Sequence, residues 1–164
     1  MNLFSKKYPL VKQIEEEDRN QAIELLNYFF RKINSYPLDG IFEVKPRAAT
    51  KMIDVYLKIR ENGKVLFLGV FDENKTLLSM LMGRVEERPY LQEGKIFYID
   101  IAVTKQGQSG KGYMKLLLDS TEEWTKKKKI QILELRTLLD NKEAIEFWKK
   151  RGYKDFYIRF RKNI

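Results

Sequence analysis

Apolar residues recur along the chain with two different periods. In four stretches they return every three or four positions, which is typical of helices with one buried face; elsewhere they form short continuous runs typical of buried strands. The first pattern predicts helices from Asp18 to the break at Tyr36, over residues 48–60, from Gly112 to about residue 128, and from Asp140 to Gly152. The second pattern predicts strands over residues 10–14, 65–71, 77–85, 95–103, 130–137 and 153–160.

The order of these elements indicates an α/β fold in one domain. Hairpins dominate the first half of the chain, and a crossover helix joins two strands in the second half. We find no repeat, no low-complexity segment and no long linker, so residues 1–164 are expected to form a single domain with a substantial core. Two helix starts have capping-box spacing, at Asp18 with Gln21 and at Asp140 with Glu143.

Two residue types are missing, and their absence excludes several kinds of chemistry. Without cysteine there are no disulfides, thiolate metal sites or cysteine nucleophiles, and without histidine there is no Ser–His catalysis and no histidine-ligated metal. We therefore expect no metal site, and proton transfer must use carboxylate, lysine, tyrosine or water. The chain also lacks an apolar run long enough for a membrane span and the apolar segment of a signal peptide, so we expect a cytoplasmic protein without a membrane partner.

The net charge of +9 suggests a polyanionic ligand, either a nucleic acid or an anionic cofactor. The densest basic block covers residues 126–129 at the end of a predicted helix, where cations interact favourably with the helix dipole. We interpret this block as a solvated helix end rather than a binding patch.

A glycine-rich turn links the predicted strand that ends at Val103 to the helix that follows. Gly107, Gly110 and Gly112 lie in or beside this turn, with lysines at positions 105 and 111. A strand, a glycine-rich turn and a helix together present backbone N–H groups and a helix N-terminus to phosphate oxygens. Glycines that only cap the helix are the simpler alternative. The spacing fits neither a Walker loop nor a dinucleotide-binding fingerprint.

Two motifs in the second half of the chain resemble those of the GNAT superfamily of N-acetyltransferases. The turn and helix read QSGKGYMKLLL over residues 108–118, similar to the (Q/R)xxGx(G/A) pattern, with either Gly110 or Gly112 as the central glycine. Residues 141–153 read NKEAIEFWKKRGY, similar to the NxxAxxFYxxxGF that often ends these proteins. The resemblance implies a mixed central sheet of six to seven strands with flanking helices, splayed between the fourth and fifth strands.

The same resemblance implies acetyl-CoA as co-substrate. The backbone of the fourth strand would pair with the pantetheine amides, and the glycine-rich turn would hold the pyrophosphate. Asn141 would hydrogen-bond the cofactor arm, unless it only caps its helix, and Trp148 would pack against the cofactor or within the core. The residues expected at the cofactor are Ile101, Ala102, Val103, Gln108, Ser109, Gly110, Lys111, Gly112, Tyr113, Asn141 and Trp148.

Two carboxylates are candidates for the catalytic base. Asp100 is the one charged residue in the apolar run FYIDIAV, and a buried carboxylate usually has a role or a partner; its alternative is a structural ion pair with a nearby arginine. Glu86 lies at the end of the third predicted strand and either lines the acceptor cleft or faces solvent. Trp148 takes the place where many family members have a tyrosine that protonates the departing thiolate, and an indole N–H does not titrate.

We therefore expect an acetyl-CoA-dependent N-acetyltransferase in which a primary amine attacks the thioester directly in a ternary complex. Backbone N–H groups of the fourth strand would stabilise the developing negative charge. The partner would be a small-molecule or peptide amine, with aminoglycosides, polyamines, amino acids and protein N-termini all open. The alternative is a non-catalytic domain of the same fold that binds an acyl-CoA or a nucleic acid, although nucleic acid is not expected. Oligomeric state is open, a homodimer included.

Overall fold

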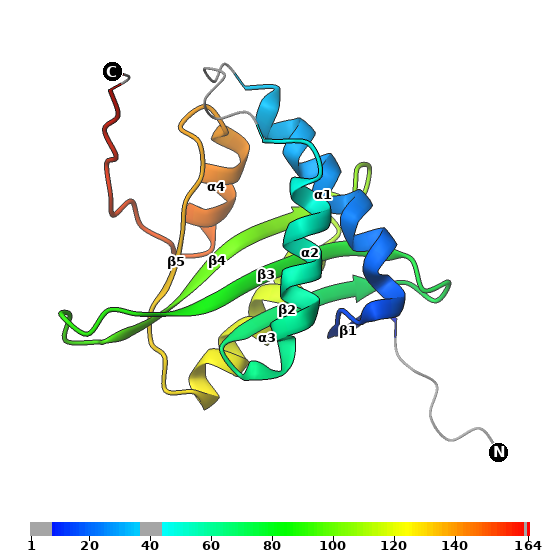
Figure 1. Ribbon diagram of the computed structural model, residues 1–164, viewed down its shortest axis with the longest axis horizontal. Helices are drawn as coiled ribbons and strands as arrows, with labels where there is room; N and C mark the ends of the chain where they lie inside the picture. The colour runs from blue at the N-terminus through cyan, green and yellow to red at the C-terminus, as the bar shows by residue number, and fades with distance from the viewer. Residues whose placement is uncertain (1–7, 37–43, 163) are drawn as a thin grey trace.

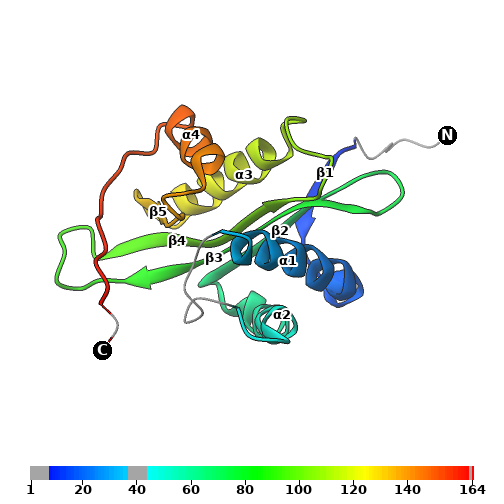
Figure 2. The same ribbon diagram turned by 90° about the horizontal axis from the view of Figure 1, so that it is seen from above.

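The computed structural model describes residues 8–36, 44–162 and 164 and shows one sheet with helices on both faces (Figures 1 and 2). The strands are β1 (Leu10–Gln13), β2 (Val65–Phe71), β3 (Leu77–Glu87), β4 (Lys95–Thr104) and β5 (Leu133–Leu135). The helices are α1 (Arg19–Asn34), α2 (Ala48–Ile59), α3 (Tyr113–Lys127) and α4 (Lys142–Lys150), with short 3-10 turns η1 (Glu16–Asp18) and η3 (Arg60–Asn62).

The strand order is β1-β2-β3-β4-β5, antiparallel except for the parallel pair β4–β5. Helices α1 and α2 cover one face of the sheet, and α3 and α4 cover the other (Figure 2). The central strands are buried on both faces, which explains their continuous apolar runs. The α1/α2 face buries Ile53, Tyr56, Phe67, Met80, Met82 and Ile101, and the α3/α4 face buries Leu66, Leu81, Phe97, Ile99, Leu117 and Trp148.

A β-bulge interrupts the pairing of β3 with β4 at Asp100. Met82 pairs with Ile101 and Gly83 pairs with Ile99, so no residue of β3 lies opposite Asp100 in the strand pairing. Gly83 suits this site because a Cβ there would lie 2.8 Å from the carbonyl oxygen of Tyr98 and closer still to the Phe97 ring. The extra residue turns Asp100 towards α2, on the same face as Ile101.

The pairing of β4 with β5 stops early. It covers only Phe97 to Ile99 on β4, although β4 continues to Thr104. Beyond Ile99, the edge of β4 that faces β5 is therefore unpaired within the described part of the chain. Because all three residues of β5 pair with β4, the expected splay between the fourth and fifth strands stays a prediction.

The expected count of six to seven strands is wrong, because the described residues form five. Residues 153–160 alternate as a strand does, but they find no partner strand among the described residues and belong to no regular element. The fifth strand is also shorter than expected. Its first predicted residue, Ile130, instead donates its N–H to Thr125 O at 3.0 Å and helps to end α3.

Neither predicted capping box forms. Asp18 accepts a hydrogen bond from the Glu15 N–H at 3.0 Å, while the Gln21 side chain bonds the backbone beyond the β2–β3 turn. At α4 the capping residue is Asn141 rather than Asp140, because the Asn141 side chain accepts from the Ala144 N–H at 3.2 Å. The predicted helix end at Gly152 is confirmed by its φ of 89°.

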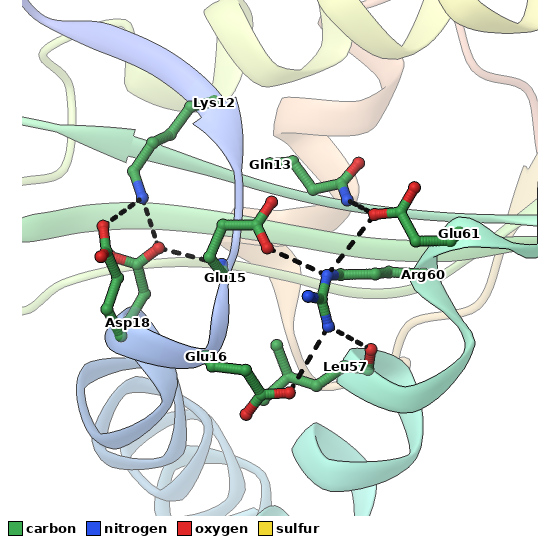
Figure 3. Close-up of polar contacts among 9 residues, drawn as sticks. Lys12, Gln13, Glu15, Glu16, Asp18, Leu57, Arg60 and Glu61 are labelled. Atoms are coloured by element: carbon green, nitrogen blue, oxygen red, sulfur yellow. Dashed lines mark hydrogen bonds and ion pairs between the residues drawn. The ribbon is translucent and has the colours of Figure 1, made fainter.

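A cluster of charges ties the end of α2 to the segment between β1 and α1 (Figure 3). Arg60 Nε lies 3.0 Å from Glu15 Oε2, an ion pair without hydrogen-bond geometry, and Arg60 Nη1 donates to Glu16 at 3.5 Å. Beside them, Lys12 pairs with the buried Asp18. The cluster fixes α2 against the sheet, and thereby fixes the side chains that α2 presents to β4. None of the described helices combines the length and apolar character that crossing a membrane requires.

Candidate active site

The glycine-rich turn before α3 is open to a ligand. Gly107, Gly110 and Gly112 have φ angles of 77°, 79° and 82°, a left-handed conformation that glycine adopts without strain. A Cβ at any of the three would meet no atom within 4 Å. These glycines are therefore needed for the path of the backbone rather than for packing against protein, and the space beside them is free.

The N-terminus of α3 offers unpaired donors. Gly112 is the capping residue, no side chain caps the helix, and the first turn holds no acidic residue. Within the described chain, the backbone N–H groups of residues 109–112 donate no hydrogen bond to protein. Lys111, which donates to Gln108 Oε1 at 2.9 Å, adds a full positive charge. The predicted residues from Gln108 to Tyr113 thus lie together around an anion-binding geometry.

The unpaired edge of β4 lies directly before this turn. Lys105 donates its N–H to Leu78 O at 2.8 Å, and Val103 O accepts from Ser79 Oγ. Antiparallel alternation then directs the N–H and C=O groups of Ile101 and Val103 towards β3. Of the three predicted strand residues, Ala102 is the one that presents both backbone groups to the open edge. Thr104, which the sequence reasoning missed, shares that orientation.

The structure places the two predicted α4 residues in structural roles. The Asn141 side-chain oxygen caps α4, as described above. Trp148 is 8% exposed, and its ring lies 5.1 Å from the Phe147 ring and 5.0 Å from the Tyr153 ring, both in edge-to-face geometry. Trp148 therefore packs in the core of the α3/α4 face.

Asp100 is held by two donors. One carboxylate oxygen accepts from the Tyr56 hydroxyl at 2.5 Å, and the other pairs with Arg84 on β3. Burial and then the hydrogen bond to Asp100 raise the pKa of Tyr56, and the hydrogen bond to Asp100 also raises the pKa of Arg84. Both groups therefore remain protonated donors at neutral pH. The sequence indicated an arginine partner as an alternative, whereas Tyr56 was missed because it comes from a distant helix.

Glu86 extends this row of charged side chains towards β5. It lies 3.5 Å from Arg84 and 3.0 Å from Arg88, and Arg88 holds Glu134 through two hydrogen bonds of 3.1 and 3.0 Å. The side chains of Asp100, Arg84, Glu86, Arg88 and Glu134 therefore form a strip of alternating charge, with three carboxylates and two arginines. Two further arginines, Arg136 and Arg159, act electrostatically on Tyr98, which lies between Arg84 and Glu134 in the sheet, so the surroundings of this strip are not net negative.

A cavity of about 360 Å³ lies between α1 and the start of the turn. Tyr28 lines this cavity and, like Phe29 and Phe30, also packs against the core of the α1/α2 face. The cavity adjoins the turn through Lys105 and Gln106. It offers polar and charged groups beside the open edge of β4.

Comparison with protein families identifies the kind of enzyme that this site belongs to. A model of the acetyltransferase (GNAT) family matches residues 10–153, which include β4, the turn and α4. The chain belongs to this family. It is therefore a GNAT acetyltransferase, an acyl-transferring enzyme, and the expectation from the two motifs is confirmed. Among the described residues of this GNAT protein, no three Asp or Glu side chains gather in a way that could hold a metal ion.

Solved structures share the GNAT fold over nearly the whole chain. The BH1408 protein from Bacillus halodurans, as a tetramutant, superposes with a TM-score of 0.81 at 14% identity, covering 94% of this chain and 99% of that one. A glucosamine-6-phosphate N-acetyltransferase from Arabidopsis thaliana gives 0.69 at 17% identity (94% and 97% covered). An aminoglycoside 6′-N-acetyltransferase from Acinetobacter haemolyticus gives 0.70 at 14% identity (94% and 99% covered). No curated protein sequence matches the chain at a significant level.

Proposed function

We propose that this GNAT protein transfers an acetyl group from acetyl-CoA to a primary amine, by direct attack of the amine in a ternary complex. The observation that supports it is the continuity of two features: the unpaired β4 edge at Ala102 runs directly into the open, uncapped turn before α3. A ligand with amide groups in an extended arm and a pyrophosphate at its end fits both. When bound, acetyl-CoA supplies the acetyl thioester.

The reaction forms a bond between the amine nitrogen and the acetyl carbon and breaks the carbon–sulfur bond. Backbone N–H groups beside the Asp100 bulge are proposed to stabilise the negative charge that develops on the acetyl oxygen. The ammonium form of the acceptor must first lose a proton, because amines of this kind have a pKa of about 10.4. The leaving thiolate takes up a proton in exchange.

Asp100 is our candidate for the proton acceptor, with Glu86 second. Asp100 lies at the bulge, and its carboxylate is oriented by Tyr56 and Arg84. Tyr56 itself is no base, because its raised pKa keeps the hydroxyl protonated. Trp148 cannot protonate the thiolate, so another tyrosine, water or the acceptor must do so. Tyr153, beside Trp148, is protonated at neutral pH, because burial and then the negative charge of Glu122 raise its pKa to about 12.

The acceptor is proposed to be a small-molecule or peptide amine that approaches from the α1/α2 face. The carboxylates of the strip from Asp100 to Glu134 and the cavity beside Tyr28 support this direction. The named acetyltransferases among the structural neighbours act on glucosamine 6-phosphate and on aminoglycosides. We also propose a cytoplasmic location.

Calorimetry with acetyl-CoA tests the cofactor site. Gly112→Asp places bulk and negative charge where the pyrophosphate is proposed to lie, so we expect binding to be abolished. Gly63→Asp is the matched control, because Gly63 also has a positive φ, of 70°, but belongs to the turn before β2. Unchanged affinity in a folded Gly112→Asp protein, or equal loss in both variants, would remove the proposed site.

Turnover is then measured over an amine panel by release of the CoA thiol. Because the protein contains no cysteine, a thiol reagent reports CoA alone, with no background from the enzyme. We expect acetyl-CoA-dependent thiol release with at least one primary amine. Tight acetyl-CoA binding without transfer to any amine, amino acid, polyamine or peptide N-terminus would contradict the proposed reaction.

A further inference from the structure

The α1/α2 face of β4 carries a tyrosine directly beside the candidate base. Phe97 and Ile99 pack in the α3/α4 core, so Tyr98 between them faces the opposite side of the sheet. Asp100 is turned to that side as well. The Arg84 guanidinium lies over the Tyr98 ring, with its central carbon 5.1 Å from the ring centroid. A phenol and a cation therefore adjoin the proposed proton acceptor.

Arg136 follows β5 on the same face of the sheet. β5 runs parallel to β4, with Glu134 opposite Tyr98. Because side chains alternate along an extended chain, Arg136 shares the face of Glu134 and comes level with the Asp100 bulge. The electrostatics agree with this placement. Burial raises the pKa of Tyr98, and Arg136 opposes that rise more strongly than any other charged group.

The chain after α4 brings a third arginine to this tyrosine. Figure 2 shows the chain crossing from the α4 side of the sheet to the α1/α2 side. Arg159, which lies on this stretch, opposes the effect of burial on the pKa of Tyr98, as Arg136 and Arg84 do. Three separate segments, β3, the end of β5 and the C-terminal stretch, thus direct positive charge at one phenol.

Two of these arginines are available to a ligand. Within the ranges that the structure describes, Arg136 and Arg159 form no ion pair and no side-chain hydrogen bond, and the Tyr98 hydroxyl forms no hydrogen bond. Both arginines are exposed. When they are counted with the strip from Asp100 to Glu134, three carboxylates face four arginines, which leaves one positive charge.

This positive charge lies far from the proposed pyrophosphate site. An extended strand advances about 3.3 Å per residue, which places the end of β4 at Thr104 about 13 Å from Asp100. The glycine-rich turn begins only beyond Thr104, whereas Arg136 is level with Asp100. An anion bound at Arg136 is therefore a different group from the pyrophosphate at the turn.

We propose that the acceptor carries an anionic group, a carboxylate or a phosphate, which Arg136 and Arg159 bind while the acceptor amine lies at Asp100. This inference rests on the amine acetylation proposed above and names the class of acceptor. Guanidinium groups bind carboxylates and phosphates through paired N–H donors. Tyr98 is a further donor, because its raised pKa keeps the hydroxyl protonated. The carboxylates of the strip complement the ammonium group at the other end of the acceptor.

Pairs of acceptors that differ only in the anionic group test the proposal, with thiol release as the assay at constant ionic strength. The pairs are β-alanine and its amide, γ-aminobutyrate and its amide, and phosphoethanolamine and ethanolamine, so that a carboxylate is distinguished from a phosphate. For at least one pair, kcat/KM should be at least about tenfold higher for the anionic member, the scale of a hydrogen bond to a charged group.

Substitutions then locate the anion. Arg136→Gln should remove the preference, chiefly by raising KM for the anionic acceptor. Arg19→Gln is the matched control, because it also removes one guanidinium, but from an ion pair with Asp54 on the outside of α1 and α2, and it should keep the preference. A preference that disappears in Arg31→Gln but survives Arg136→Gln would place the anion in the cavity beside Tyr28 and overturn the proposal.

Calorimetry in the presence of CoA, which has no acetyl group to transfer, measures acceptor binding without turnover. Anionic acceptors should bind at least about tenfold more tightly than their neutral partners, and Arg136→Gln should bind both alike. Such binding without any transfer would contradict the reaction proposed above and keep the anion site. Transfer to neutral and anionic amines at equal kcat/KM would keep the reaction and overturn the anion site. Equal affinity for both members of every pair also overturns it.

Discussion

The contact between Asp100 and its two donors leads to a kinetic prediction. Asp100→Asn preserves the shape of the side chain and removes its charge and basicity. If Asp100 accepts the proton of the acceptor, kcat should fall about 100-fold or more, the usual scale for a lost general base. That factor corresponds to about 2.7 kcal/mol of activation free energy. The acid limb of the pH–rate profile should also flatten, while acetyl-CoA affinity stays nearly unchanged.

The same substitution should cost little stability. The Arg84 side chain is 44% exposed, so the loss of its ion pair should lower the free energy of unfolding by about 1 kcal/mol or less. The Tyr56 hydroxyl can still donate to the new amide oxygen, and exchanging a charge-assisted hydrogen bond for a neutral one costs about 1 kcal/mol. The sum, about 1–2 kcal/mol, lowers Tm by a few degrees and leaves the protein folded at 25 °C. Lost rate and lost stability are therefore separable.

Steady-state kinetics across pH, with thiol release as the assay, gives the answer. Tyr56→Phe removes one donor and keeps the carboxylate, so kcat should change less than tenfold. Asp119→Asn is the control for a general charge effect, because Asp119 is also paired, with Lys115 and Arg151, but on the outer surface of α3. An Asp100→Asn enzyme that keeps both its rate and its acid limb would refute the role, and Glu86 would be the next candidate.

Three further predictions concern other parts of the molecule. Replacing the exposed lysines at 126–129 by glutamine should leave acetyl-CoA affinity within about threefold, and a tenfold loss at physiological salt in calorimetry would show that the block touches the ligand. Trp148→Phe should lower the free energy of unfolding by about 2 kcal/mol, because it leaves a cavity, yet change kcat less than tenfold; a folded, cofactor-binding but inactive variant would contradict the packing role. Hydrogen bonds from Lys115 and Arg151 lower the pKa of Asp119, so these contacts stabilise the fold above the unfolded pKa near 4 and are lost as pH falls further. The small Tm difference between the natural chain and Asp119→Asn should therefore shrink as pH falls below about 4, and a constant difference across pH would argue against the ion pairs.

Local sequence patterns predicted most of the fold because its elements bury clear apolar faces. The strands at β2 and β4 and the helix α2 lie within one or two residues of their expected bounds. Residues 153–160 show where the pattern stops being informative, since alternation reveals a capacity to pair but not the presence of a partner. The cap of α4 was predicted one residue too early, and Asp18 was assigned the wrong hydrogen-bond partner. In both places several neighbouring polar residues could act as the cap.

The candidate site could likewise be predicted from the sequence only in part. The glycine-rich turn could be predicted because its backbone chemistry is written in consecutive residues. The contact between Tyr56 and Asp100 could not, because it depends on how α2 lies across β4, and that placement follows from packing over the whole α1/α2 face. Ala102 could be distinguished from its neighbours only once the hydrogen-bond register of β3 and β4 was known.

The bulge at Asp100 shifts by one residue the alternation of β4 side chains between the two faces of the sheet. Before it, Ile99 points to the α3/α4 core; after it, Ile101 and Val103 point to the opposite core, although regular alternation would put Ile99 and Ile101 on one face. Side-chain chemistry at position 100 can therefore change without disturbing the inside–outside alternation on either side. Deleting that one residue would make Ile99 and Ile101 neighbours on opposite faces, so the rest of β4 would keep its pairing and its core contacts and only the carboxylate would be lost. The protein thus carries Asp100 as an extra position, outside the regular alternation that builds both cores along one continuous strand.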